Sequence, residues 1–170
     1  FQSLELYDDL SVEENVSVAA FGAAVRDEAI TAALDRVGIS ALRERPAGDL
    51  SQGERQLVSI ARACVAEPHV LLLDEPAAGL DGIERARLGE RIRSIGRTGT
   101  GVLLVDHDVS LVLSVCDLIY VLDFGAVIAH GPPSVIRSDA GVAAAYLGTA
   151  GDHAAPEPAL APTAPTPPPP

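Results

Sequence analysis

Two short apolar runs in the sequence lead into acidic or imidazole side chains. Val70–Leu73 is followed by Asp74 and Glu75, and Val102–Val105 is followed by Asp-His-Asp at 106–108. Such runs predict buried parallel strands, and open α/β sheets bind ligands beyond the carboxyl ends of their strands. Asp74 would suit Mg²⁺, and Glu75 could orient or deprotonate an attacking water. The pattern favours phosphoryl-transfer chemistry; taken alone, it fits equally well two carboxylates that only cap a turn.

The pattern LSQGE at residues 50–54 marks the start of a helix. Ser51 and Glu54 fit a capping box, and apolar residues follow at helical spacing. The exposed N–H groups and dipole of this helix would favour a phosphate, and Gly53 would let the phosphate approach the backbone closely. A capping box alone indicates only a helix start, and it is the position of this pattern ahead of Asp74 that favours a phosphate site.

The composition excludes several other kinds of chemistry. All 12 basic residues are arginines, so the chain has no lysine for a Schiff base, a Ser-Lys dyad or a phosphate-binding P-loop. The net charge of -12 disfavours a nucleic-acid partner, because Lys and Arg drive phosphate binding. Cys64 and Cys116 lie in apolar stretches without CxxC spacing and predict buried free thiols. Acidic residues interrupt the apolar runs, which leaves them too short to cross a membrane.

The elements that must position these side chains follow an α/β order. Residues 8–45 predict helices, and a turn at 46–49 precedes the strand, helix, strand, helix, strand pattern. The third apolar run, Leu118–Leu122, is expected to join the first two in a parallel sheet that is buried on both faces. Gly82–Ile95 predicts the surface helix that connects the first two strands.

The last part of the chain contains a further strand, two short helices and a tail. Phe124–His130 predicts the strand, and residues 132–137 and 140–147 predict the helices. The composition then changes to Ala, Pro and Thr, so residues 149–170 predict a disordered tail. The predicted class is therefore α/β, with a helical insertion in front.

Five short motifs, in their order and spacing, resemble those of ATP-binding cassette ATPases. They are the signature helix Leu50-Ser-Gln-Gly-Glu54 with Ala61-Arg-Ala63, the Walker B strand Leu71-Leu-Leu-Asp-Glu-Pro76, the D-loop Ala78-Gly-Leu-Asp81 and the switch histidine in Val105-Asp-His107. The resemblance implies a P-loop NTPase-like fold with a parallel sheet. Residues 1–49 would form the Q-loop and helical subdomain, and residues 50–148 the RecA-like part. The family's P-loop, with its lysine, is expected upstream of Phe1.

The resemblance implies roles for one group of residues around an ATP bound by the same subunit. Asp74 would bind Mg²⁺, and Glu75 would be the catalytic base. His107 would hold the γ-phosphate and the attacking water. Gln2, in the Q-loop, would link the metal and the water to the transmembrane partner.

A second group would act on ATP bound by another subunit. In the family's head-to-tail dimer, Ser51, Gln52 and Gly53 would contact the γ-phosphate held by the opposite nucleotide-binding subunit. Asp81 would cross the dimer interface. Asp106 and Asp108 are interpreted instead as turn or capping residues, and the remaining histidines receive no role.

Within the family, Ala77–Asp81, Val121–Ala129 and Ala144–Gly148 resemble the importers of branched-chain amino acids and related amides. The chain would then drive transmembrane permease subunits from the cytoplasmic face of the cell membrane. One alternative is a permease-free ATPase of this family that acts on chromosomes or ribosomes, which the acidic charge disfavours. Another is a non-catalytic module that lends its signature residues to a P-loop-bearing partner.

Overall fold

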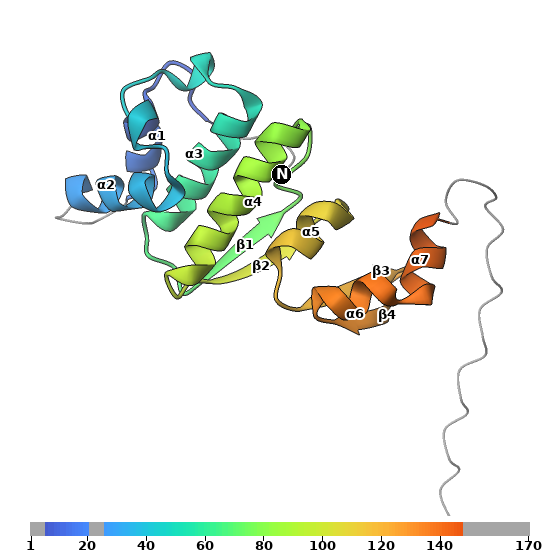
Figure 1. Ribbon diagram of the computed structural model, residues 1–170. Coiled ribbons are helices and arrows are strands. Elements are labelled where there is room, and N and C mark those ends of the chain that lie inside the picture. The colour runs from blue at the N-terminus through green and yellow to red at the C-terminus, as the bar shows by residue number, and fades with distance from the viewer. Residues whose placement is uncertain (1–5, 21–25, 148–170) are drawn as a thin grey trace, which may run out of the picture.

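A computed structural model describes residues 6–20 and 26–147 of the chain (Figure 1). The predicted Q-loop residue Gln2 and the predicted tail at 149–170 lie outside the described residues. The elements, in order, are α1 (Val12–Ser17), α2 (Arg26–Val37), the 3₁₀ turns η1 (Ser40–Leu42) and η2 (Ala47–Asp49), α3 (Gln52–Cys64), β1 (Val70–Asp74), α4 (Gly82–Arg97), β2 (Gly101–Val105), α5 (Val109–Val115), β3 (Ile119–Asp123), β4 (Ala126–Gly131), α6 (Pro133–Ser138) and α7 (Ala140–Leu147).

The helices at the start of the chain are held together by a capping box and an ion-pair cluster. Ser11 caps α1: its side chain accepts from the Glu14 N–H, and the Glu14 carboxylate accepts from the Ser11 N–H. The Arg43 guanidinium bonds Glu13 of α1 through Nε, at 2.9 Å, and Asp27 of α2, at 2.6 Å. Its hydrogen bonds hold the pKa of Glu13 below the ordinary value. The cluster therefore fixes α1 against α2.

β1 and β2 form a parallel pair whose register runs from Val70 opposite Gly101 to Asp74 opposite Val105. Side chains alternate along a strand, and Leu71 of β1 is buried in the same core as the inner residues of α3 and α4. The other face carries exposed side chains, with Leu72 69% and Leu103 58% exposed. The expectation of burial on both faces is thus wrong for this pair, because the described helices cover only one face (Figure 1).

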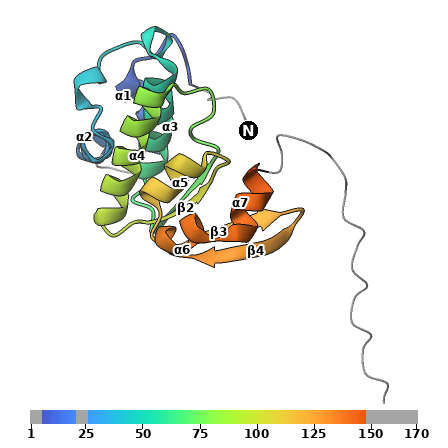
Figure 2. The ribbon, with the colours of Figure 1, turned by 45° about the vertical axis from the view of Figure 1, so that its right-hand side comes forward.

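The third apolar run does not join the parallel sheet, contrary to the prediction. β3 pairs with β4 in an antiparallel hairpin, which forms a sheet of its own. Phe124 and Gly125 make the turn between them with φ of 43° and 80°, the left-handed geometry of tight hairpin turns. This short connection pairs β3 with its sequence neighbour. Helices α6 and α7 lie against the hairpin (Figure 2), around a small core of Ile119, Val121, Ile136 and Val142.

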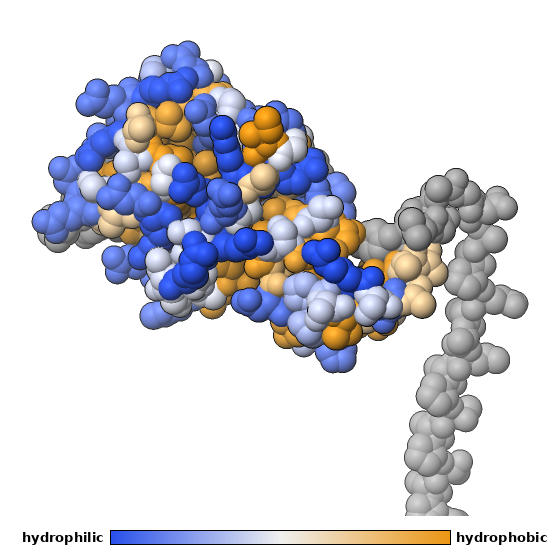
Figure 3. Space-filling view, in the orientation of Figure 1, coloured by the Kyte–Doolittle hydropathy of each residue, from blue (hydrophilic) through white to orange (hydrophobic). Residues whose placement is uncertain are grey.

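Other expectations agree with the structure. The α/β class, the parallel strands and the predicted helix between them are confirmed. The outward surface over α4 is largely hydrophilic, as expected for a surface helix (Figure 3). Cys64 is buried and Cys116 half-buried, both are free, and burial raises the pKa of each thiol. Within the part of the chain that the structure describes, no helix is both long and apolar enough to cross a bilayer.

Candidate functional site

The parallel register brings the polar ends of β1 and β2 to one edge of the sheet. Asp74 is the last residue of β1 and lies opposite Val105, and its side chain is exposed. Glu75 and His107 follow the two strands, and His107 Nδ1 lies 3.6 Å from Glu75 Oε1. Both side chains are open to solvent, at 73% exposure for His107 and 45% for Glu75. The structure therefore places a carboxylate and an imidazole side by side, as the two motifs predict for neighbouring parallel strands.

The backbone of Glu75 adopts a conformation that few non-glycine residues take. Its φ is 45°, in the left-handed region, and its N–H donates to the Val105 carbonyl at 2.7 Å. This hydrogen bond extends the β1–β2 pairing by one residue while the chain turns away from the strand. Residues held in such conformations often occur at functional sites. The turn directs the Glu75 carboxylate toward His107.

Asp106 holds together the segments that follow the two strands. Its side chain is only 1% exposed, and its carboxylate accepts from the Ala77 N–H at 3.3 Å and the Asp108 N–H at 2.8 Å. Asp108 caps α5 by accepting from the Leu111 N–H at 2.9 Å. The interpretation of Asp106 and Asp108 as turn and capping residues is confirmed. They hold the backbone on either side of His107, and the buried Asp106 carboxylate also lies 3.9 Å from His107 Nδ1.

The second predicted group lies at the start of α3. Ser51 is the N-cap and forms the predicted capping box with Glu54, with hydrogen bonds of 3.3 Å and 2.9 Å. Gln52 is exposed and Gly53 is buried. The helix start that the sequence predicts is therefore confirmed, and it presents an exposed Ser-Gln pair.

A residue that the sequence reasoning missed, Glu84, bonds to this helix start. Its Oε1 accepts from the Ser51 hydroxyl at 2.8 Å and from the Gly53 N–H at 3.2 Å. A Cβ on Gly53 would lie 2.9 Å from that oxygen, so a larger residue at this position would push the Glu84 carboxylate away from the α3 backbone. Glu84 is detectable in the sequence only as the fourth residue of an Asp-x-x-Glu pattern, which begins at Asp81 and marks another capping box.

Asp81 occupies the N-cap of α4. Its Oδ1 accepts from the N–H groups of Ile83 and Glu84, at 2.8 Å each, and completes the capping box with Glu84. Asp81 is exposed. The described geometry thus gives Asp81 a local capping function, and its exposure leaves its outer face available to a partner.

Arg85, which follows Glu84 in α4, connects the first turn of α4 with the segment that carries His107. Arg85 pairs with Asp108 at 2.9 Å and donates to the Leu80 carbonyl at 3.0 Å. Glu84 bonds to the start of α3, so two successive residues of α4 contact Ser51 and Gly53 on one side and Asp108, next to His107, on the other. The first turn of α4 therefore connects the segment at 51–53 with the segment that carries His107.

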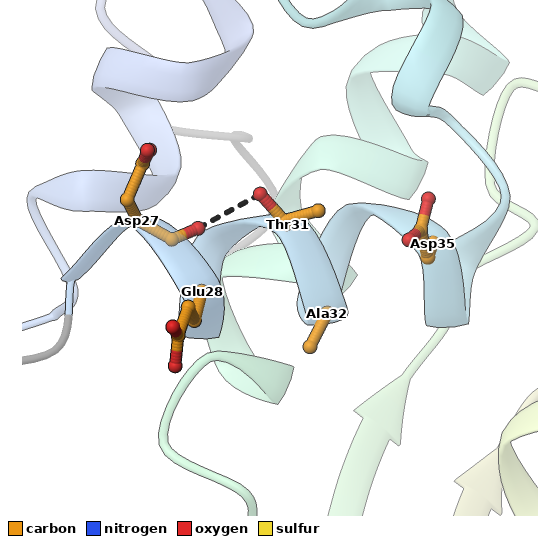
Figure 4. A pocket seen from close by; sticks show the side chains of 5 residues that line it. All are labelled: Asp27, Glu28, Thr31, Ala32 and Asp35. Atoms are coloured by element: carbon orange, nitrogen blue, oxygen red, sulfur yellow. Dashed lines mark hydrogen bonds between the residues drawn. The ribbon is translucent and has the colours of Figure 1, made fainter.

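A shallow depression of about 340 Å³ lies elsewhere, on α2 (Figure 4). It is lined by Asp27, Glu28, Thr31, Ala32 and Asp35. The Thr31 hydroxyl donates to the Asp27 carbonyl, so it is already bonded within the helix. None of the predicted site residues lines this depression, and we do not assign it to the site.

The side chains at the strand ends could supply only part of the ligand set of a magnesium ion, which is usual for Mg²⁺ sites. Across residues 6–20 and 26–147, no group of three His, Cys, Asp or Glu side chains is placed to hold a metal by itself. Mg²⁺ is commonly bound through one or two carboxylates, with its other ligands supplied by phosphate oxygens and water. The exposed Asp74 carboxylate at the strand end matches this mode.

Two protein families match parts of this chain. The family described as "ABC transporter" matches residues 1–78, and the family described as "Branched-chain amino acid ATP-binding cassette transporter" matches residues 126–152. The two matches lie on either side of α4, β2, α5 and β3.

Curated relatives have related descriptions. The high-affinity branched-chain amino acid transport ATP-binding protein LivG of Salmonella typhimurium is 36% identical, over 88% of this chain and 67% of LivG. The lipopolysaccharide export system ATP-binding protein LptB of Escherichia coli is 38% identical, over 85% of this chain and 56% of LptB. The chain thus spans about two thirds of LivG and just over half of LptB.

Solved structures share the fold. The ADP conformation of MJ1267, an ATP-binding cassette of an ABC transporter, aligns with a TM-score of 0.71 and 26% identity, over 83% of this chain and 64% of MJ1267. CbiO1 from Clostridium perfringens, part of the transporter complex cbiONQ, aligns with a TM-score of 0.69 and 29% identity, over 85% of this chain and 59% of CbiO1.

Proposed function

Because this chain belongs to the ATP-binding cassette transporter ATPases, we propose that it contributes to two ATP sites in a head-to-tail dimer. One contribution comes from Asp74, Glu75 and His107, and the other from Ser51–Gly53. The observation that carries the proposal is the 3.6 Å approach of Glu75 to His107 at the carboxyl edge of the parallel strands.

At the first site, these side chains would act on an ATP bound by the same subunit. Asp74 would hold Mg²⁺, which neutralises charge on the phosphates when it is bound. Glu75 would accept a proton from the attacking water, and its backbone conformation directs its carboxylate toward His107. The imidazole of His107 would hold the γ-phosphate and the water in line. Gln2, outside the described residues, would connect this site to the permease.

At the second site, the start of α3 would act on an ATP bound by the partner subunit. Ser51, Gln52 and the Gly53 N–H would donate to its γ-phosphate, since helix N-termini favour anions. Asp81 would cross the dimer interface. ATP binding would then close the dimer, and hydrolysis would reopen it.

We infer that the transported substrate is a branched-chain amino acid or a related amide. The similarity to LivG and the family match at residues 126–152 support this inference. The similarity to LptB, which is described as part of an export system, supports a role in transport. The inference of import therefore rests on the features shared with LivG. The chain would bind its permease at the cytoplasmic face of the membrane as a peripheral subunit.

A first experiment tests whether this chain needs a P-loop lysine from elsewhere to hydrolyse ATP. The purified 170-residue chain should show negligible ATPase activity, because all 12 of its basic residues are arginines and none supplies the P-loop lysine. Phosphate release from MgATP is the readout, with Glu75→Gln as the background control. Robust turnover that Glu75→Gln abolishes would contradict the need for this lysine.

A further inference from the structure

The hydrogen-bond donors proposed for the partner's γ-phosphate already have an anionic partner. The Glu84 carboxylate accepts from both the Ser51 hydroxyl and the Gly53 N–H through the same oxygen, at 2.8 Å and 3.2 Å. The Ser51 hydroxyl has one proton to donate. That proton cannot bond fully to Glu84 and to a phosphate at the same time.

The position of Glu84 is set by its own helix as well as by α3. The Asp81 capping box fixes the first turn of α4, and the second carboxylate oxygen of Glu84 faces the Asp81 N–H at 3.5 Å. The absence of a Cβ on Gly53 allows the carboxylate to reach the α3 backbone. The contact is thus built from both helices, and a carboxylate placed there repels an incoming phosphate.

We propose that Glu84 is a positioning residue that occupies the anion-binding donors of Ser51 and Gly53, and that a phosphate must displace it to bind there. This inference rests on the proposed function, since it concerns the same donors. Glu84 also connects Ser51 and Gly53 with the D-loop residue Asp81. Phosphate binding at Ser51 and Gly53 would therefore release a contact that ties α3 to α4.

The test titrates the 170-residue chain with inorganic phosphate and follows the amide resonances of Gly53 and its neighbours by NMR. Glu84→Gln is the informative variant: glutamine still fits the capping box at this position, whereas the negative charge is lost. Glu90→Gln removes the same charge from an exposed position of the same helix and serves as the matched control. Glu84→Ala, which removes the acceptor altogether, provides a second variant.

We expect both Glu84 variants to bind phosphate at Gly53 with an apparent Kd at least tenfold lower than that of the wild type and of Glu90→Gln. Equal affinities in all four proteins would overturn the role of Glu84 while leaving the anion site intact. If the Gly53 resonance shifts with phosphate in none of the four proteins, the anion site itself is overturned, and with it the proposed role of Ser51–Gly53.

Discussion

In an active ATPase that contains this chain together with a P-loop, Glu75→Gln should retain ATP binding and lower hydrolysis by about 10²–10⁴-fold, the usual contribution of a positioned general base. Glutamine has nearly the same shape, so it can keep the contact with His107, 3.6 Å away, but it cannot take up the proton of the water. Binding of a labelled nucleotide and steady-state phosphate release measure the two quantities separately.

Glu67→Gln is the matched control for this experiment. Glu67 is also an exposed glutamate with a positive φ, 48° against 45° at Glu75, and it precedes β1 rather than following it. Its replacement should leave turnover within about twofold of the wild type, because it lies outside the proposed site. Unchanged turnover in Glu75→Gln would remove Glu75 from the role of catalytic base.

The second large effect concerns stability. Asn15 is fully buried and holds the segment before α1: its side-chain oxygen accepts from the Tyr7 N–H, and its amide donates to the carbonyls of Tyr7, Leu10 and Ser11. Asn15→Ala removes the acceptor of the Tyr7 N–H, and each of the three carbonyls keeps only its backbone donor, so we expect the free energy of unfolding to fall by about 3 kcal/mol. Urea denaturation followed by circular dichroism measures the change.

Two further variants separate lost hydrogen bonds from other effects. Asn15→Asp keeps the size and the acceptor but turns the donors into a carboxylate that faces carbonyl oxygens, so it should destabilise at least as much as alanine. Ser17→Ala, in the same helix, removes one exposed hydrogen bond to the Glu14 carbonyl and should cost under about 1 kcal/mol. Equal effects of Asn15→Ala and Ser17→Ala would contradict the role given to Asn15.

Local signals in the sequence predict much of this structure. The capping pattern at Ser51 and Glu54 identifies the start of α3, because the two hydrogen bonds form within four residues. The apolar runs before Asp74 and Asp106 identify β1 and β2, and the parallel pairing follows from the helix between them. The approach of Glu75 to His107 then follows from the shared edge of the sheet.

Features that depend on tertiary pairing could not be predicted in this way. The run at 118–122 has the composition of a buried parallel strand, yet a two-residue turn at Phe124–Gly125 pairs it with β4 instead. Whether the outer face of β1 and β2 is buried depends on which elements pack against it. The apolar side chains of Leu72 and Leu103 do not determine this, and both are exposed. Glu84 lies 33 residues from Ser51 in the sequence, so its contact appears only in the folded chain.

The most direct test of the composite ATP site is the effect of MgATP on subunit association. In an active ATPase that contains this chain together with a P-loop and carries Glu75→Gln, sedimentation should show a dimer that forms with MgATP, and adding Ser51→Arg should weaken association at least tenfold. Ser11→Arg, at the capping box of α1, controls for the loss of a helix cap and should leave association unchanged. ATP-bound monomers, or a dimer insensitive to Ser51→Arg, would contradict a site shared between two subunits.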